Sequence, residues 1–536
     1  MNSIRLANQV ARDYFGYSAL RPVQEQAIAS VMDGRDTWVV VPTSSGKSAI
    51  YQIPAIISEG TAIVFSPLIA LMTDQVQKLH DWGVRAARLT GDMSDTEVQR
   101  VMRSMDDYSL MYVAPERLKS GTFLRQLRQI KVSMIVLDEA HMLPQAQQDF
   151  RPAYTMIGKV VRQYFPEAPR LALTATADRE EERIVTRSLG MEDYTRIVQS
   201  PRRDNLEYHV LHDIEDLRLL HMIRAEGWGV NSGCAVVYAS TRQRVYDLAR
   251  DLRTMKFASV EPYHGGMTGE ARQAVQDRFM TGETRIIVAT NAFGLGVDKS
   301  DVRAVIHADP PDSIHAYLQE AGRGGRDGKP CTCVLNIKQK GLRSRRFFIE
   351  CANPAKRYYD AVWERWSADR KVREPFDDDT RSLMFAILAE KGVSKIMAPY
   401  FATTILNYLQ FRGVIQAIPD KTVQPCRPRN LGAFQRFASR HRASIRRIRP
   451  NEATVTVYPG RKSPIPAMLG SHAIYPFTPD QRAIEHYKLM RLTEEHGILA
   501  HELSDKRSAA YDRLRQLQDF AEAPDKHEYI DRVYGA

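Results

Sequence analysis

The feature that most constrains the fold is an alternation of short apolar runs with helical patterns over the first 340 residues. TWVVVP, TAIVFSP and SMIVLDEA are runs of this kind, and after a break near residues 200–231 they resume with CAVVYAST, TRIIVATN and RAVIHAD. Strands that alternate with helices are typical of parallel α/β sheets. We therefore predict an α/β protein with two parallel-sheet lobes, residues 1–200 and 201–340. Most polar motifs follow the strands directly, where such sheets bind their ligands.

Length and composition limit the class of protein. The 536 residues are too many for one hydrophobic core, so we expect three or four domains. No apolar run approaches the roughly 18 residues of a membrane span. The first 17 residues carry charges where a signal peptide has its apolar segment, and five cysteines are few enough for a reducing compartment. These features predict a cytoplasmic protein.

A candidate phosphate loop lies in the stretch VVVPTSSGKSAIYQIP, where a strand pattern gives way to small residues and then to a helical pattern. The backbone N–H groups of such a loop wrap a phosphate, Lys47 supplies charge and Ser48 holds Mg²⁺. The strict form of the motif has a glycine where Val41 stands. An ordinary strand-to-helix turn is therefore the alternative. The loop residues are Thr43, Ser44, Ser45, Gly46, Lys47 and Ser48.

Two carboxylates follow another strand pattern, in VLDEAH at 136–141. Nucleotide hydrolysis needs one carboxylate to hold Mg²⁺ and another to orient the attacking water. Asp138 suits the first role and Glu139 the second. Acidic pairs at strand ends also occur by chance, so this pair gains its meaning from the candidate phosphate loop upstream.

The second lobe ends in QEAGRGGRDG at 319–328, where glycines surround Arg323 and Arg326. An arginine that reaches from one lobe to a phosphate held by the other stabilises the charge that develops during phosphoryl transfer. The alternative is a basic, glycine-rich surface turn.

Taken in order, these motifs resemble those of superfamily 2 helicases of the RecQ type. Residues 15–24 resemble that family's adenine-recognition motif, with Leu20 where a Phe is usual. The other matching stretches, between residues 10 and 340, are TSSGKS, FSPLIALMTDQV, YVAPERL, DEAH, LTATA, VVYASTR, YHGGM, ATNAFGLGVDKSDVRAVIH and QEAGRGGRDG.

The resemblance implies two RecA-like lobes and an ATP-dependent DNA helicase that uses Mg²⁺, moves 3′ to 5′ and works in DNA repair or recombination. Its partner would be DNA, both single-stranded and branched or tailed duplex. If the protein is bacterial, the resemblance also implies association with the nucleoid. The roles that it implies are Arg21 and Gln24 at adenine, Lys47 at the β- and γ-phosphates, Ser48 and Asp138 at Mg²⁺, Glu139 in water activation, His141, Thr174 and Thr176 in coupling to DNA, Gln319 and Arg323 in the ATP cleft, and Arg326 as the arginine finger.

The loop after DEAH departs from the family pattern. The family has an aromatic-rich loop there that couples DNA binding to hydrolysis, and Phe150, Arg151 and Tyr154 match it. Ala146 replaces the family's Trp, and Gln148 replaces its His. We therefore expect coupling that is weaker or differently built.

The family's four-cysteine zinc module is also missing, because no cysteine lies between Cys351 and Cys426. A structural zinc needs four ligands, usually in two close pairs. We predict no zinc, and we interpret Cys331 and Cys333 as core residues of a strand.

The last third of the chain changes character. We predict a helical connector over 341–378, a winged-helix-like segment over 379–420, for which a plain helical bundle is the alternative, and a basic region of unknown fold over 421–536, with a helical tail from Asp480. Residues 421–450 hold nine Lys/Arg and no acid, which suits contact with DNA phosphates. The competing interpretation is that these arginines bind acidic residues such as those at 374–379, or a partner protein.

Three functions stay open on the sequence. The first is a DNA-dependent ATPase that separates strands. The second is a translocase on duplex DNA or an RNA helicase, and the third is an ATP-gated DNA-binding scaffold with negligible turnover.

Overall fold

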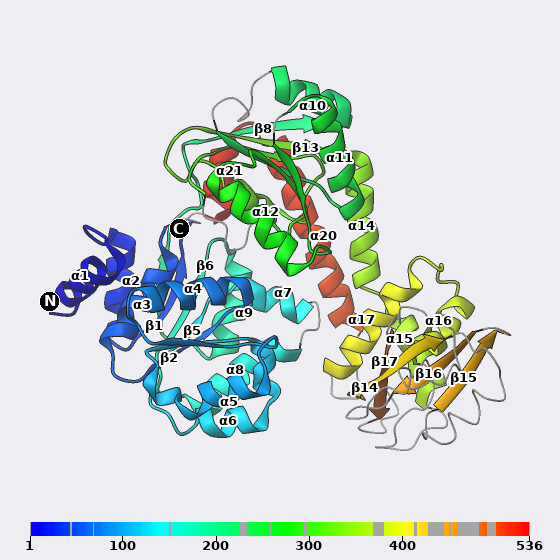
Figure 1. The fold of residues 1–536 in the computed structure, drawn as a ribbon, viewed down its shortest axis with the longest axis horizontal. Helices are drawn as coiled ribbons and strands as arrows, with labels where there is room; N and C mark the ends of the chain where they lie inside the picture. Colours follow the sequence, from blue (N-terminus) through cyan, green and yellow to red (C-terminus); the bar gives the residue numbers. More distant parts are fainter. Residues whose placement is uncertain are drawn as a thin grey trace, which may run out of the picture. The chain divides into compact units, whose positions relative to one another are not determined.

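The chain forms two compact units. The structure, a computed structural model, describes residues 2–42, 45–67, 69–148, 152–225, 233–257, 259–293, 299–367, 380–411, 415–426, 444–449, 452–457, 482–489 and 500–534. One unit joins residues 1–348 with residues 508–536, and the other spans Ile349–Arg507. The first unit holds both lobes that the sequence predicts (Figure 1).

Lobe 1 is built on a parallel sheet of order β3-β4-β2-β5-β6-β1-β7. Its strands are β1 (Asp36–Val40), β2 (Thr61–Phe65), β3 (Ala86–Leu89), β4 (Leu110–Val113), β5 (Val132–Leu137), β6 (Arg170–Thr174) and β7 (Tyr194–Val198). Its helices are α1 (Asn2–Phe15), α2 (Pro22–Met32), α3 (Lys47–Ile57), α4 (Ile69–Asp81), α5 (Asp95–Arg103), α6 (Gly121–Leu127), α7 (Met142–Gln148), α8 (Pro152–Tyr164) and α9 (Arg179–Leu189), with short 3-10 turns η1 (Met105–Asp107) and η2 (Pro115–Lys119).

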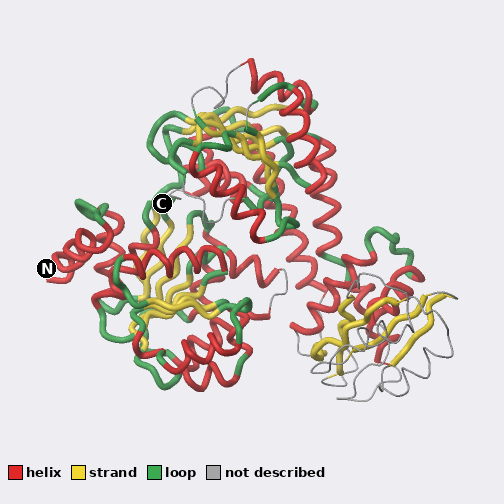
Figure 2. The backbone as a smooth tube through the Cα atoms, in the orientation of Figure 1, coloured by secondary structure: helices red, strands yellow, loops and turns green. Residues whose placement is uncertain are grey.

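The central strands of lobe 1 are mostly apolar because both faces of the sheet are buried there. Val39 and Val64 belong to the core on one face, which also contains side chains of α2, α3 and α4. Their chain neighbours Trp38 and Phe65 belong to the core on the other face, together with side chains of α6, α8 and α9. Successive strand residues point to opposite faces, so a strand covered on both sides loses the polar alternation of a half-exposed one. Figure 2 shows the strands lying between these helices.

Lobe 2 repeats this plan with a parallel sheet of order β10-β11-β9-β12-β13-β8. Its strands are β8 (Leu206–His212), β9 (Cys234–Tyr238), β10 (Val260–Tyr263), β11 (Ile286–Ala289), β12 (Val302–His307) and β13 (Cys331–Ile337). Its helices are α10 (Asp216–Ala225), α11 (Arg242–Thr254), α12 (Gly269–Thr281) and α13 (Ile314–Ala321), and α14 (Gln339–Ala352) leads into the second unit. The prediction of two parallel α/β lobes is confirmed.

The second unit combines helices with an antiparallel sheet of order β15-β16-β14-β17. Its elements are α15 (Lys356–Ser367), α16 (Thr380–Glu390), α17 (Ala398–Phe411), β14 (Ile415–Cys426), β15 (Ser444–Arg449), β16 (Glu452–Val457) and β17 (Arg482–Leu489). Tyr359 and Tyr408 meet in its core with ring centroids 5.7 Å apart. The winged-helix interpretation and the predicted boundaries at 378 and 420 stay predictions.

The helical tail predicted from Asp480 is wrong for its first part. Residues 482–489 form β17, which pairs with β14 through registers such as Ile415 with Leu489. Pairing with a distant strand outweighs the local helical pattern there, as tertiary context commonly does. Helical structure begins only with α20 (Ala500–Glu522) and continues in α21 (Lys526–Tyr534).

The last two helices return to lobe 2. Phe520 of α20 packs against Tyr208 of β8 and Tyr317 of α13, with ring centroids 5.8 and 5.3 Å apart. Asp531 of α21 accepts a hydrogen bond of 2.6 Å from the Ser200 hydroxyl, in the segment that joins the lobes. The sequence pattern predicts 421–536 as one region. In the structure, residues 508–536 belong to the same unit as the two lobes.

Candidate nucleotide site and interlobe contacts

The phosphate-loop candidate joins β1 to α3. Gly46 has a φ of +73°, and a Cβ atom added there would lie 2.5 Å from Nε2 of Gln24, so only glycine fits. Lys47 and Ser48 are the first residues of α3. A helix N-terminus presents unpaired N–H groups and the positive end of the helix dipole to an anion. Thr43 and Ser44 lie outside the described residues.

Gln24 holds the end of this loop. Its Nε2 donates to the carbonyls of Ser45 and Gly46 at 3.1 and 3.2 Å, and its Oε1 accepts from the backbone N–H of Arg21 at 2.9 Å. The residue is 3% exposed. These bonds give Gln24 a structural role in the loop, while the adenine contacts of Gln24 and Arg21 stay predictions.

The two carboxylates meet the loop because β1, β6 and β5 are neighbours in the sheet. Parallel strands end at the same edge, so Asp138, Glu139 and Lys47 come together there. Lys47 Nζ lies 3.4 Å from Glu139 Oε1. Asp138 is 7% exposed, and its Oδ1 accepts from the Glu139 backbone N–H at 2.9 Å.

The surroundings shift the pKa values of these two carboxyl groups in opposite directions. Burial, and then the neighbouring Glu139 carboxylate, raises the pKa of Asp138 to about 7. Burial also acts to raise the pKa of Glu139, but the Lys47 ammonium and His141 outweigh it, and the pKa is lowered. Glu139 is therefore ionised at neutral pH, and Asp138 is a buried carboxylate that needs a cation nearby.

The arrangement fits Mg²⁺ with a nucleotide. A buried carboxylate with a raised pKa gains most from a divalent cation. The glycine-capped helix start and the Lys47 ammonium supply the phosphate side of such a site. Asp138 and Ser48 would hold the ion.

A row of polar side chains leads from these carboxylates to lobe 2. His141 Nδ1 lies 2.9 Å from the Thr174 hydroxyl, and the Thr174 hydroxyl donates to the carbonyl of Thr176 at 3.0 Å. The Thr176 hydroxyl lies 3.3 Å from Nδ1 of His315, a residue of α13. The structure thus brings together His141, Thr174 and Thr176, three of the six residues predicted to couple hydrolysis to DNA.

Lobe 2 presents the predicted cleft residues around the end of α13. Gln319 lies in the last turn of α13, and Arg323 follows the helix and is 7% exposed. The charge of Arg323 contributes to the low pKa of Glu139, so the two residues interact across the lobes. Arg326 follows in the same glycine-rich segment and is partly buried.

Comparison with known proteins agrees with this geometry. Residues 21–184 match the DEAD/DEAH box helicase family, and residues 217–328 match the helicase conserved C-terminal domain. The chain is 36% identical over 347 residues to the ATP-dependent DNA helicase RecQ of Bacillus subtilis, covering 64% of this chain and 58% of that protein. It is also 36% identical over 338 residues to the RecQ of Synechocystis sp., covering 62% of this chain and 70% of that protein. The chain belongs to the RecQ helicase family.

Within the RecQ family, the chain spans about half the length of several curated relatives that it matches, for example 52% of the RecQ of Pasteurella multocida. Among solved structures, the helicase MrfA bound to DNA superposes with a TM-score of 0.54 at 19% identity, covering 78% of this chain and 62% of that chain. That likeness supports the fold.

The loop that couples DNA to hydrolysis in the RecQ family is only partly described. Phe150 and Arg151 lie outside the described residues. Tyr154 lies in α8, is 3% exposed and belongs to the core of lobe 1. Its role in coupling stays a prediction.

Sequence reasoning missed four residues of lobe 2 that border the predicted site: Tyr238, His307, His315 and Glu320. His315 and Gln319 are one helical turn apart, so helical spacing from a RecQ motif residue could have pointed to His315. The other three lie within stretches that resemble RecQ motifs, but their contacts with each other depend on the fold, so the motifs alone did not single them out.

The cysteines follow the predicted pattern where they are described. Cys331 and Cys333 lie in β13 and are 1% and 0% exposed, which confirms them as core residues. Within the described ranges, the one group of three or more metal-ligand side chains is Asp178, Glu181 and His315, which includes no cysteine. In those same ranges, no helix has both the length and the apolar character to cross a membrane.

Proposed function

We propose that the protein is an ATP-dependent DNA helicase of the RecQ type that moves 3′ to 5′ on single-stranded DNA and separates strands. The observation that carries the proposal is the meeting of Lys47, Asp138 and Glu139 at one edge of lobe 1, with Lys47 Nζ 3.4 Å from Glu139. Membership of the RecQ family supports the choice of DNA as the substrate.

The site residues act on the nucleotide as follows. Bound Mg²⁺–ATP would supply the phosphoanhydride bond that is cleaved. The Lys47 ammonium and the N–H groups at the start of α3 balance phosphate charge. Glu139 stays ionised and accepts a proton from the attacking water, while Arg326, from lobe 2, stabilises charge that develops in the transition state.

The row from His141 through Thr174 and Thr176 to His315 supports coupling between the lobes. Because its members lie on both lobes, a change in lobe separation alters these contacts. Such a change is the physical basis on which hydrolysis can drive movement along DNA.

The experiment compares ATP hydrolysis with no nucleic acid, single-stranded DNA, duplex DNA and RNA, followed by strand displacement on forked, tailed and four-way DNA. Stimulation by single-stranded DNA together with strand displacement supports the proposal. Stimulation without displacement would identify a translocase, and DNA binding with negligible phosphate release would identify an ATP-gated scaffold. Stronger stimulation by RNA would identify an RNA helicase.

We further propose that the protein works without zinc, acts in DNA repair or recombination, and lies in the cytoplasm, at the nucleoid if it is bacterial. The cysteine spacing supports the first point. Metal analysis of the purified protein tests it, and one tightly held zinc per chain would contradict it.

A further inference from the structure

Glu320 occupies a position that is unfavourable for an acidic side chain. It is the second-last residue of α13, where the negative end of the helix dipole repels a carboxylate. It is also 8% exposed, and a buried charge is costly unless a partner compensates it. Glu320 bears both of these energetic costs, and it lies in the sequence between Gln319 and the glycine-rich segment that carries Arg323.

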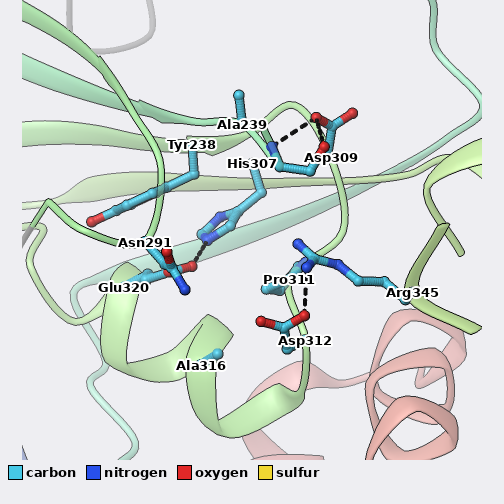
Figure 3. A pocket seen from close by; sticks show the side chains of 11 residues that line it. Tyr238, Ala239, Asn291, His307, Asp309, Pro311, Asp312, Ala316, Glu320 and Arg345 are labelled. Atoms are coloured by element: carbon cyan, nitrogen blue, oxygen red, sulfur yellow. Dashed lines mark hydrogen bonds and ion pairs between the residues drawn. The ribbon is translucent and has the colours of Figure 1, made fainter. Parts of the chain in front are cut away.

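The compensating partner is His307, the last residue of β12. Its Nε2 lies 2.7 Å from Oε2 of Glu320, and the histidine is 1% exposed. A dashed line marks this contact in Figure 3. The imidazole lies against the ring of Tyr238 on β9 at 5.0 Å and 22°, and against Tyr317 of α13 at 4.9 Å and 58°. These rings fix the orientation of the histidine, so its bond fixes the Glu320 carboxylate.

The same cluster reaches Arg323. The Tyr238 hydroxyl donates to the carbonyl of Phe293 at 3.2 Å, which holds the ring in place. Burial raises the pKa of the Tyr238 phenol, and the Arg323 guanidinium beside it acts in the opposite direction. The backbone N–H of Arg323 donates to the carbonyl of Glu320 at 3.2 Å. The contacts therefore close a ring from Glu320 through His307 and Tyr238 to Arg323 and back to Glu320.

The cavity beside this pair is too small for a substrate. It has a volume of about 70 Å³, and Glu320, His307 and Asn291 are among its lining residues (Figure 3). Ligand sites for molecules of drug size occupy roughly 300–1,000 Å³. The cavity therefore leaves no room for a ligand of that size beside the Glu320–His307 pair.

We propose that Glu320 is a positioning residue for ATP hydrolysis, which orients the end of α13 so that Gln319 and Arg323 face the nucleotide. The inference rests on the proposed function, since it assigns Arg323 to the ATP cleft. Without the carboxylate, the last turn of α13 loses its anchor to β12. The Arg323 guanidinium then keeps its charge but is no longer held in one orientation. That orientation governs the rate of phosphoryl transfer more than it governs ATP binding.

The test uses the full chain with Glu320→Ala, Glu320→Gln and a matched control, Glu261→Ala. Glu261 lies in β10 of the same lobe and also accepts hydrogen bonds, from the partly exposed Arg278 at 2.7 Å and from the buried Thr284 at 2.6 Å. We expect Glu320→Ala to lower kcat for DNA-stimulated hydrolysis by about tenfold or more, with a smaller change in KM for ATP. Glu320→Gln can still accept a hydrogen bond from His307, so it should recover part of that loss. Glu261→Ala should lower the melting temperature without a selective loss of kcat.

A double-mutant cycle completes the test. Glu320→Ala and His307→Asn should have effects on kcat that do not add, because both remove one interaction. If the wild-type chain shows no DNA-stimulated hydrolysis, the proposed function fails. If the wild-type chain is active but Glu320→Ala resembles Glu261→Ala, or if the two effects simply add, the positioning role is overturned.

Discussion

The imidazole of His141 and the hydroxyl of Thr174 lie 2.9 Å apart. The Thr174 hydroxyl has one proton and donates it to the carbonyl of Thr176, so His141 Nδ1 must carry the proton of their bond. Burial lowers the pKa of His141 to about 4, which leaves the ring neutral at pH 7. His141 is thus the tautomer with a proton on Nδ1, which can also donate toward Glu139 at 3.4 Å.

Removal of the Thr174 hydroxyl should break the series of polar contacts that runs from His141 through Thr174 and Thr176 to His315. In Thr174→Val the shape is kept, but His141 loses its nearer acceptor in a buried site, at a cost of up to about 1–3 kcal/mol. We expect the ratio of DNA-stimulated to basal ATP hydrolysis to fall. Thr174→Ser keeps the hydroxyl and serves as the control. Equal ratios in the valine and serine variants would show that the hydroxyl has no part in coupling.

Lys47→Ala should abolish ATP hydrolysis, lowering the rate by about a hundredfold or more, because its charge acts on the phosphates. DNA binding should stay largely intact. The control is Lys131→Ala, which removes an exposed lysine of the same lobe paired with Glu59. Phosphate release and DNA binding are measured on folded protein. Near-normal turnover of Lys47→Ala would reject the nucleotide site.

Arg326→Ala should slow hydrolysis by roughly a thousandfold while ATP affinity changes little, because a finger residue acts on charge in the transition state. Single-turnover hydrolysis and nucleotide binding separate the two effects. Loss of affinity with an unchanged rate would make Arg326 a ground-state ligand, and Arg323 would become the finger candidate.

Asp216 should stabilise lobe 2 in a pH-dependent way. Burial acts to raise the pKa of Asp216, but hydrogen bonds from Arg244, at 3.0 Å to each carboxylate oxygen, and from Lys338 outweigh it, and the pKa is lowered. A lowered pKa stabilises the fold above the unfolded value of about 3.9, and that stability is lost as the pH falls through the folded value.

The Asp216 prediction is checked by the melting temperatures of Asp216→Asn and wild type across pH. We expect a constant difference between about pH 5 and 8 that shrinks only below about pH 4. The partly exposed Asp251 supplies the control variant Asp251→Asn. A difference that grows as the pH falls would contradict the assignment.

The basic stretch 421–450 should contribute to DNA binding through phosphate contacts. Arg446 and Arg447 lie in β15, whereas Arg440 and Arg442 lie outside the described residues. Replacement of all four by Ala should weaken binding similarly for all DNA sequences. On a plot of log K against log salt concentration, the slope should become less steep by as much as about three to four. ATP hydrolysis at saturating DNA should survive.

The control for the basic stretch replaces four exposed arginines of lobe 1, at positions 100, 103, 125 and 183, by alanine. If the arginines of 421–450 instead bind acidic residues of the chain or a partner protein, the 421–450 variant loses thermal stability or that partner, and its salt dependence on DNA stays unchanged.

The sequence was informative wherever local pattern and final contact coincide. Strands such as β2 and β5 are mostly apolar because both faces are covered, so their pattern predicts the lobes directly. Lys47, Asp138 and Glu139 follow strands that are near neighbours, and the rule for parallel sheets places them at one edge.

Other features depend on contacts between distant segments. The sequence of residues 482–489 does not indicate that β14 will pair with them. Neither does an aromatic residue such as Phe520 indicate which surface it will cover. The pairing of Glu320 with His307 requires the end of β12 to reach the end of α13, which only the assembled sheet provides.

The return of α20 and α21 to lobe 2 makes residues 349–507 an insertion within the unit that holds both lobes, and not an appendage at its end. The chain leaves through α14 and comes back through α20, and these helices touch where Lys506 donates to the Ala352 carbonyl at 3.3 Å. A chain truncated at residue 348 would strip Phe520 and Tyr534 from lobe 2 and expose apolar surface. An excision of the insertion that rejoins α14 to α20 would keep that surface covered. The smallest chain that keeps both lobes and their covering helices is therefore expected from an internal deletion and not from truncation.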